Sequence, residues 1–402
     1  MRWFRKVRYV LKKQQRHVLH ALDRFAQFIA DVLYDRRSCW KARLLAFCLV
    51  PLSLLFLVIV KIRVWLYRKR IFKVQALGCH VIVVGNITMG GTGKTPVAEY
   101  LANLLQSMGR KPAIISRGYK SKNESWYKKF WRWLTHAPER PPKVVSDGNE
   151  VLLDSEHAGD EPYMLATNLQ GVPVVVDKDR VKAGRHAIKR FHADVLILDD
   201  GYQYLRLAST LRIVLIDCSN PFGNYYLIPR GILRESLSHL DRASLIILTK
   251  SKGGKNTALL QELSKVNGNV PIAECSHYPC YFVRQDGVEI LPPDAIRGKK
   301  VALFCAIASP TGFEDFIYQL GAKIIYKKYY LDHHRFSEIE LSSIDERTQF
   351  ADYLITTEKD IVRISKDFQF HVPLYYLRVE IKFLNNESAL RDLLQATLRP
   401  AT

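Results

Sequence analysis

The chain has 402 residues, of which 25% are charged and 48% hydrophobic, and its formal net charge is +21. That length predicts about two domains with a sizeable buried core. The charge would suit a nucleic-acid partner, but residues 1–73 contain 18 Lys/Arg and 3 Asp and so carry +15 of it. Because no nucleic-acid-binding module follows, this distribution argues against nucleic acid and for a membrane surface.

Residues 1–40 form a basic N-terminal extension with apolar residues at helical spacing between positions 18 and 33. Several aromatic residues accompany the basic ones: Trp3, Phe4, Tyr9, Phe25 and Phe28. An amphipathic segment of this kind suits an anionic cytoplasmic leaflet, where each nearby cation contributes about 1 kcal/mol. The alternative is a solvated basic arm.

Residues 41–73 are predicted to form a membrane-associated helix with basic flanks. Residues 44–60 contain no charged residue, which is near the lower limit of the roughly 17–25 residues that cross a bilayer. Pro51 and the two basic flanks allow either a single span or a tilted, partly inserted helix. A cleaved signal peptide is not expected, because the apolar run begins far from the N-terminus and no small-residue cleavage site follows it.

A strand, a glycine-rich turn and a helix follow one another between residues 81 and 108. This order is what phosphate binding at a helix N-terminus requires, since backbone N–H groups converge on the phosphate, a lysine adds charge and a hydroxyl can bind Mg²⁺. The strict pattern has glycine where this chain has Thr88, so a chance glycine-rich turn is the alternative. The predicted nucleotide-binding residues are Thr88, Met89, Gly90, Gly91, Thr92, Gly93, Lys94 and Thr95.

From residue 74 onward, short β-branched runs alternate with amphipathic stretches. Strands are expected at 113–116, 172–176, 195–198, 213–216 and 245–248, and helices at 96–108 and 180–191. This alternation of strands and helices predicts a P-loop NTPase-like parallel α/β sheet domain over 74–295. The pattern restarts with strands at 301–306 and 353–356 and a helix at 313–320, which predicts a second, smaller α/β lobe over 296–402.

Three groups of polar residues are candidates for chemistry. Asp199 and Asp200 follow a buried strand, as the acidic partner of a phosphate loop does when it holds Mg²⁺. Asp160 stands at a probable helix start, where capping the helix is the alternative role. His333 and His334 form a pair that by itself is equally compatible with a surface position.

Seven cysteines at positions 39, 48, 79, 218, 275, 280 and 305 are scattered along the chain. Cys275 and Cys280 have no second pair nearby, so zinc is not expected. Reduced thiols in a cytosolic compartment are the better interpretation.

Several of these segments resemble the tetraacyldisaccharide 4′-kinase family of lipid A biosynthesis, in the same order and at similar spacing. The resemblance covers about residues 40 to 365. Its motifs are GNITMGGTGKTP (85–96), SRGY (116–119), AGDEP (158–162), LDDGYQYLRLA (198–208), FGNYYLIPRGILRE (222–235), LDHH (331–334) and TTEKD (356–360). The chain departs from the family where a histidine is usual and Tyr204 stands, where the usual glycines near 306–309 are replaced, and in a longer span after SRGY.

The resemblance implies an ATP- and Mg²⁺-dependent kinase that phosphorylates the 4′-hydroxyl of an acylated glucosamine disaccharide 1-phosphate, giving lipid IVA. It further implies that Thr95, Asp199 and Asp200 hold Mg²⁺, with Glu235 as an additional carboxylate. Asp160 and His333 are implied to act together in activating the sugar hydroxyl. Because the two residues fall in different predicted lobes, this pairing would require them to meet across a cleft.

A membrane-embedded substrate would require the active site to be held at the membrane surface, which the N-terminal segments could do. The resemblance implies that the protein lies at the cytoplasmic face of the bacterial inner membrane and contacts its lipids. Residues 120–133 interleave aromatic and basic side chains, as interfacial segments do, although a surface helix is the alternative. Two other classes of function stay open. One is a membrane-anchored ATPase that drives a partner, and the other is an adaptor with a degenerate nucleotide site.

Overall fold

The computed structural model describes residues 27–118, 140–365 and 367–398. Two compact units are present: one comprises residues 27–63, 88–90 and 222–236, and the other comprises the remaining described residues. Most of the basic extension and the whole aromatic insertion at 120–133 lie outside the described residues.

The second unit is built on one 13-stranded sheet. Its strands, in spatial order, are β11 (Lys323–Tyr329), β10 (Lys300–Cys305), β12 (Tyr353–Thr357), β13 (Leu374–Asn385), β8 (Ile272–Arg284), β7 (Leu245–Thr249), β6 (Leu211–Asp217), β1 (His80–Gly85), β5 (Val195–Asp199), β2 (Pro112–Ser116), β4 (Val174–Val176) and β3 (Lys143–Ser146), with β9 (Ile290–Leu291) beside β8. The strands predicted from the sequence are all present, with bounds shifted by at most two residues.

The helices account for the remaining periodic segments. They are α2 (Trp40–Arg68), α3 (Lys94–Ser107), α5 (Ser155–Ala158), α6 (Asp160–Asn168), α7 (Arg180–Phe191), α8 (Thr257–Asn267), α9 (Pro310–Gln319), α10 (Glu338–Thr348), α11 (Glu358–Ile361) and α12 (Glu387–Thr397), with 3₁₀ turns at Leu237–Arg242 and Pro293–Ile296. Residues 27–33 are also helical.

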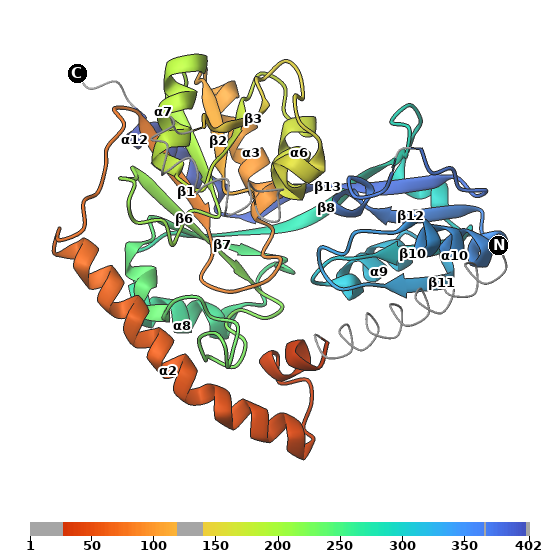
Figure 1. Ribbon diagram of the computed structural model, residues 1–402, viewed down its shortest axis with the longest axis horizontal. Coiled ribbons are helices and arrows are strands. Elements are labelled where there is room, and N and C mark those ends of the chain that lie inside the picture. The colour runs from red at the N-terminus through yellow and green to blue at the C-terminus, as the bar shows by residue number, and fades with distance from the viewer. Residues whose placement is uncertain (1–26, 119–139, 366, 399–402) are drawn as a thin grey trace, which may run out of the picture. The chain divides into compact units, whose positions relative to one another are not determined.

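Two parallel halves of the sheet are joined by a long antiparallel pair, β8 and β13 (Figure 1). The other strand pairs are parallel except β3–β4 and β8–β9. Strands before and after residue 295 therefore share one sheet, and α12 packs Leu390, Leu394 and Leu398 into the core of the first half. The boundary proposed near residue 295 stays a prediction, and the sequence pattern did not reveal this continuous sheet.

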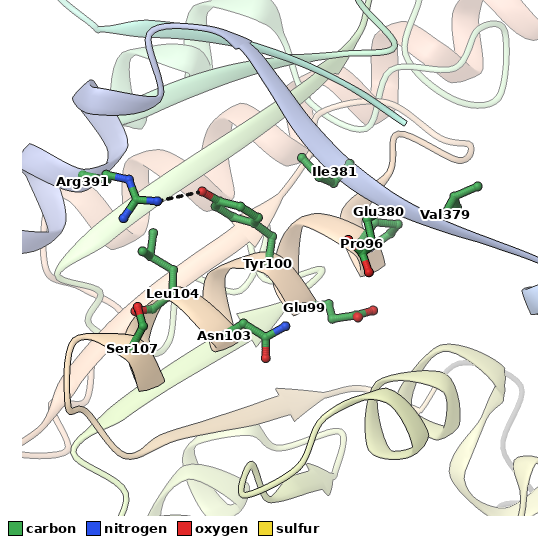
Figure 2. Close-up of a pocket in the computed structure, with 10 residues that line it drawn as sticks. All are labelled: Pro96, Glu99, Tyr100, Asn103, Leu104, Ser107, Val379, Glu380, Ile381 and Arg391. Carbon is green, nitrogen blue, oxygen red and sulfur yellow. Dashed lines mark hydrogen bonds between the residues drawn. The ribbon is translucent and has the colours of Figure 1, made fainter. Parts of the chain in front are cut away.

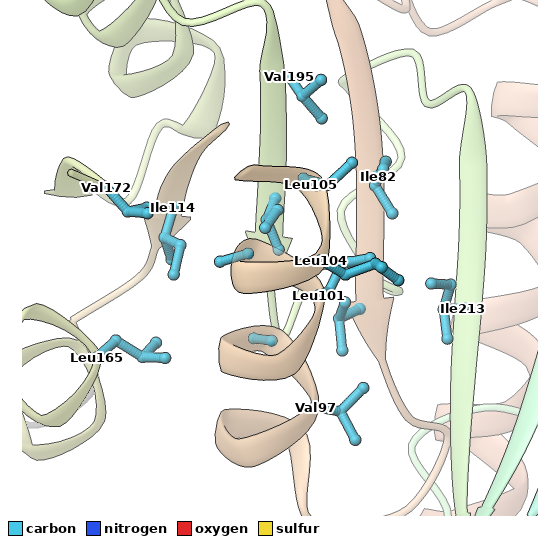
Figure 3. Packing of buried hydrophobic residues seen from close by; sticks show 14 of the residues in the cluster. Ile82, Val97, Leu101, Leu104, Leu105, Ile114, Leu165, Val172, Val195 and Ile213 are labelled. Carbon is cyan, nitrogen blue, oxygen red and sulfur yellow. The ribbon is translucent and has the colours of Figure 1, made fainter. Parts of the chain in front are cut away.

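The core of the first half shows why α3 forms and where it must lie (Figure 3). Val97, Leu101, Leu104 and Leu105 recur at helical spacing and are buried. They pack against strands such as β1, which are buried on both faces, as expected for a parallel sheet covered by helices. This packing fixes the N-terminus of α3 at the carboxyl end of β1.

In the second half of the sheet, successive side chains of β10 point to opposite faces and enter two different core clusters. Val301, Leu303 and Cys305 pack with α9, while Ala302 and Phe304 pack with α10 on the opposite side. This period of two is the side-chain alternation of a strand with helices on both faces.

Helix α2 differs from the others because its large apolar side chains are exposed. It is, among the described residues, the one helix long and apolar enough to cross a membrane by length and composition. Phe47, for example, is 76% exposed and Leu55 58%. Pro51 lies inside the helix without ending it. Exposed contiguous apolar surface of this kind marks an interaction site for lipid or protein.

Candidate active site

The phosphate loop joins the end of β1 to the first turn of α3. Gly93 precedes α3 with a φ of 78°, a left-handed conformation that favours glycine. A Cβ there would also lie 3.2 Å from His277 Nε2, so close approach is a second reason for glycine. Thr88–Gly90 belongs to the first unit, in which the Met89 N–H donates to the Ile232 carbonyl at 2.7 Å.

Lys94, the first residue of α3, points to the predicted acidic group. Its Nζ lies 3.6 Å from Asp200 Oδ1 and 3.5 Å from Asn86 Oδ1, and its side chain is 10% exposed. Asp200 directly follows β5, which pairs in parallel with β1 so that Val84 lies opposite Asp199. The carboxyl ends of these strands therefore bring the two carboxylates to the phosphate loop.

Asp199 is almost fully buried at the end of β5. Burial, together with the negative charges of Glu161 and Asp200, raises the pKa of its carboxyl to about 7, although Lys94 and Ser116 act to lower it. The Ser116 hydroxyl donates to Asp199 Oδ2 at 3.3 Å. Few protein contacts offset the loss of solvation of the ionised Asp199 carboxylate. A cation bound beside it would therefore be favoured.

Buried polar atoms without partners cluster around this loop. Within the described residues they include Asp199 Oδ1, the Thr92 hydroxyl and Asn86 Nδ2. Such atoms normally have hydrogen-bond partners in folded proteins. A carboxylate oxygen, a hydroxyl and an amide N–H are together the groups that a Mg²⁺–phosphate ligand would satisfy, so these residues fit the predicted magnesium nucleotide. Thr95, the predicted hydroxyl ligand, is also buried.

Asp160 and His333 are in contact. His333 Nδ1 lies 3.1 Å from Asp160 Oδ2, and both side chains are largely buried. The Asp160 side chain does not cap α6, whose N-cap is Gly159 and has no side-chain hydrogen bond. His333 adopts a left-handed φ of 64°, and its N–H donates to the Ala306 carbonyl. The capping role considered for Asp160 is therefore wrong, and its carboxylate faces the imidazole.

Two arginines hold the Asp160 carboxylate in its charged form. Arg363 Nε donates to Oδ2 at 2.9 Å, and Arg335 lies 3.4 Å from Oδ1. Burial acts to raise the pKa of Asp160, but the hydrogen bond with His333 and the two guanidinium charges outweigh it and leave the pKa lowered. Arg363 is itself fixed by Asp360 at 3.0 Å.

The charge on Asp160 decides the tautomer of His333. An ionised carboxylate only accepts hydrogen bonds, so we assign the proton to Nδ1, which donates to Asp160, and Nε2 is the acceptor. Lys359 Nζ lies 3.3 Å from that Nε2 and 3.2 Å from Glu161 Oε1. The imidazole is therefore oriented with its basic nitrogen toward a lysine.

Glu161 links the two groups of residues. It pairs with Lys359 on one side, and its charge raises the pKa of Asp199 on the other. Lys359 and Arg363 were not identified from the sequence as site residues. Lys359 stands in the TTEKD segment and Arg363 three positions after it, but charged residues in isolation look like surface residues. Their contacts with Asp160, Glu161 and His333 form only in the folded chain.

His334 has a different environment from His333. Its Nε2 lies 3.1 Å from Glu340 Oε1, and its ring stacks on Tyr330 with centroids 4.7 Å apart. Glu340 is also part of the capping box of α10, whose N-cap residue is Ser337. His334 therefore stabilises the loop before α10 and does not contact Asp160.

Two other predicted positions have distinct surroundings. The Tyr204 hydroxyl donates to Asp179 at 3.1 Å, and its ring lies under the Arg180 guanidinium at 4.9 Å, so this position supports the start of α7. Glu235 is buried in the first unit, and its role as a metal ligand stays a prediction. No group of three or more His, Cys, Asp or Glu side chains suited to a metal is found in the described part of the chain.

A pocket of about 330 Å³ lies away from all the predicted site residues, between α3, β13 and α12 (Figure 2). Tyr100 and Arg391 meet across it at 3.5 Å. Tyr100 also pairs with Glu387. The Tyr100 and Arg391 contacts secure α12 against α3, and none of the groups described above opens into this pocket.

Comparisons with known proteins show the family to which the chain belongs. The family model described as tetraacyldisaccharide-1-P 4′-kinase matches residues 45–399. A curated tetraacyldisaccharide 4′-kinase of Geobacter sulfurreducens is 37% identical, over 86% of this chain and 91% of its own length. One of Syntrophus aciditrophicus is 36% identical, over 84% and 89%.

A solved structure is also similar. It is LpxK from Aquifex aeolicus in complex with ATP, with a TM-score of 0.68 and 28% identity, and the match covers 88% of this chain and 99% of that one. Sequence and fold are therefore both similar over most of the chain. The chain belongs to the tetraacyldisaccharide-1-P 4′-kinase family.

Proposed function

We propose that this protein transfers the γ-phosphoryl group of ATP to the 4′-hydroxyl of an acylated glucosamine disaccharide 1-phosphate, giving lipid IVA. The observation that carries this proposal is the Asp160–His333 pair, which lies in the same unit as Lys94 and the Asp199–Asp200 carboxylates. A phosphate loop handles the nucleotide, and a buried His–Asp pair suits the activation of a weak nucleophile.

His333 is the general base in this proposal. Asp160 accepts from Nδ1–H, so that Nε2, the nitrogen facing Lys359, is the one that takes the proton of the sugar hydroxyl. As the oxygen–phosphorus bond forms, the bond to the β-phosphate oxygen breaks and its electron pair leaves with ADP. Asp160 also stabilises the imidazolium that results. A positioned base typically accelerates such a step by roughly 10²–10⁴-fold.

Lys94 supplies positive charge where negative charge is handled in phosphoryl transfer. Thr95, Asp199 and Asp200, with Glu235 as a further candidate, would hold Mg²⁺. The ion, when bound, neutralises phosphate charge. In the arrangement seen here Lys94 pairs with Asp200, and we infer that nucleotide binding replaces this pairing with contacts to phosphate.

We further propose that the protein acts at the cytoplasmic face of the bacterial inner membrane and contacts its lipids through α2. The exposed apolar side chains of α2 support this assignment. Such a location is required if the acylated substrate stays in the bilayer. Neither zinc nor nucleic acid has a part in the proposed reaction.

The test is direct: purified protein is incubated with Mg-ATP and the disaccharide 1-phosphate, and the lipid products are separated by mass. We expect a product heavier by one phosphate, formed in step with ADP. A partner-driven ATPase would instead release ADP without any change in the lipid. Lys94→Ala serves as the control and should abolish both products in a folded protein.

A further inference from the structure

A basic pocket of about 900 Å³ lies where α2 ends and the chain enters the sheet unit. We call it the basic pocket and define it by Arg68, Arg70, Lys73 and Arg185, which line it together with Tyr67 and Phe72. No Asp or Glu lines it among the described residues. These residues all belong to the second unit and are separate from the groups around Asp160 and Lys94.

Most of this positive charge is not neutralised by the protein. Arg68 pairs with Asp241, and Arg185 donates to the neutral Gln75 amide at 2.8 Å. Within the described chain, Arg70 and Lys73 have no side-chain partner. The C-terminus of a helix carries about half a negative charge, which accounts for one cation in its last turn but not for Lys73 or Arg185 beyond it.

The pocket is built on fixed backbone. The Gln75 N–H donates to the Arg206 carbonyl at 2.8 Å, and the Ala208 N–H donates to the Gln75 carbonyl at 2.9 Å. The rings of Tyr67 and Phe72 meet edge to face with centroids 5.2 Å apart. These contacts hold the segment after α2 against residues 206–208, so the cations surround a preformed hollow.

Apolar side chains lie beside these cations. Trp65, Ile71, Phe72 and Val74 are all exposed, at 52%, 57%, 43% and 46%. Aromatic and apolar side chains next to a cluster of Lys and Arg, at the end of an apolar helix, are the composition of the headgroup region of a membrane. A soluble anion would account for the charge but not for this apolar border.

We propose that the basic pocket binds the phosphate of an anionic membrane phospholipid, whose acyl chains lie against the apolar residues at the end of α2. The site deepens the proposed membrane association and does not depend on the kinase assignment. The lipid is a bilayer component and not the substrate, because within residues 27–118, 140–365 and 367–398 the pocket residues make no contact with the candidate active site. Such a site would orient the end of α2 at the headgroup level.

The experiment uses the full chain in neutral dodecyl maltoside micelles doped with either phosphatidylglycerol or phosphatidylcholine. Thermal unfolding gives an apparent affinity, because a ligand that binds only the folded state raises Tm in a concentration-dependent way. We expect phosphatidylglycerol to raise Tm well above phosphatidylcholine. The triple variant R70Q/K73Q/R185Q should bind phosphatidylglycerol roughly 10–100-fold more weakly, since each cation near an anionic headgroup contributes a several-fold factor.

The matched control is R297Q/K299Q/R347Q, which removes the same charge from exposed positions elsewhere in the same unit and should retain the response. The single variants R70Q and K73Q, each expected to weaken binding several-fold, provide the test if the triple variant does not fold. The proposal fails if both triple variants lose the response equally, if the two lipids act alike on the wild type, or if inorganic phosphate reproduces the effect.

Kinase assays in undoped micelles separate this proposal from the kinase assignment. The pocket variant should keep the wild-type KM for the acylated disaccharide, because the pocket is not part of the active site. A raised KM together with lost phosphatidylglycerol binding would mean that the pocket is a substrate subsite, and would overturn the proposal. If the wild type does not phosphorylate the lipid, the kinase assignment is wrong, but the proposal that the pocket binds phosphatidylglycerol is not affected.

Discussion

At the scale of single residues, the site depends on charges that only the fold brings together. Asp160 stays ionised because Arg363 and Arg335 offset its burial, and its charge in turn orients His333. Lys359 then lies at the nitrogen that would accept the substrate proton. The sequence was sufficient to predict Asp160 and His333 through motifs that resemble a known family. It was not sufficient for Lys359 and Arg363, because burial of a charged side chain depends on distant segments.

Lys359 offers a test of how His333 is held. We expect Lys359→Met to lower kcat while ATP affinity changes little, since Lys359 contacts His333 and Glu161 and not the phosphate loop. Steady-state measurement of kcat, with ATP affinity determined on the same preparation, checks both effects. A variant with normal kcat would mean that Lys359 has no influence on the base.

His334 is the matched control for the imidazole itself. His334→Ala should keep most of the activity, because that ring pairs with Glu340 and Tyr330 rather than with Asp160. It should instead lower stability modestly, since the loss of one hydrogen bond to a charged group costs about 1.5–3 kcal/mol. Denaturant unfolding and kcat, measured on the same preparation, distinguish the two effects. An inactive but stable variant would show that the wrong histidine has been assigned.

At the scale of helices and strands, a buried ion network ties four elements together. Arg378 of β13 contacts Glu358 of α11 at 2.7 and 2.8 Å and also pairs with Glu99 of α3. Asn168 of α6 donates to both carboxylates. Helix α3 carries Lys94 and α6 begins at Asp160, so this network connects the helix after the phosphate loop to the helix that carries the partner of the proposed base.

Removing the positive charge of Arg378 from this network should strongly destabilise the folded protein. We expect Arg378→Met to lower the free energy of unfolding by about 3–5 kcal/mol at neutral pH, because two buried carboxylates lose their partner. Urea unfolding checks this value. Arg284→Met removes an exposed arginine that also pairs with two carboxylates, and it should change stability little.

The loss at Arg378 should also depend on pH. Burial already raises the pKa of Glu99, and removal of Arg378 takes away the main effect that opposes it. An acid with a higher pKa in the folded state binds more protons there, so folding is favoured as the pH falls toward that pKa. The deficit of Arg378→Met should therefore shrink between pH 8 and pH 5. A deficit that grows over this range would contradict the assignment of buried, charged carboxylates.

At the scale of the whole molecule, local patterns and long-range pairing differ in how far the sequence predicts them. Each predicted strand and helix from residue 81 onward is present, because apolar runs and helical periodicity reflect burial directly. The continuous sheet was not predicted. It depends on β8 and β13, in which polar residues such as Glu274 and Arg378 interrupt the apolar pattern and whose pairing joins positions about a hundred residues apart.

The proposed membrane attachment is assigned to α2. We expect the double substitution Leu55→Asp/Val58→Asp to release the protein from vesicles, because a charge near the centre of an inserted helix costs about 2.5–3.5 kcal/mol. Both side chains are at least half exposed, so the fold should survive. Phe350→Asp, at an exposed apolar residue outside α2, should leave vesicle binding unchanged. Co-sedimentation of the double variant at wild-type levels in high salt would place the attachment elsewhere.

The central claim is that Asp160 and His333 act as one unit on the sugar hydroxyl, and a double-mutant cycle on lipid phosphorylation tests it most directly. The variants are Asp160→Asn, His333→Ala and the double mutant, with ATP affinity measured alongside. We expect His333→Ala to lower kcat by roughly 10²–10⁴-fold with little change in ATP affinity. The double mutant should be little worse than either single mutant, because residues that act as a unit are strongly non-additive. Fully additive losses would contradict the account, since they would show that the contact at 3.1 Å has no part in the reaction.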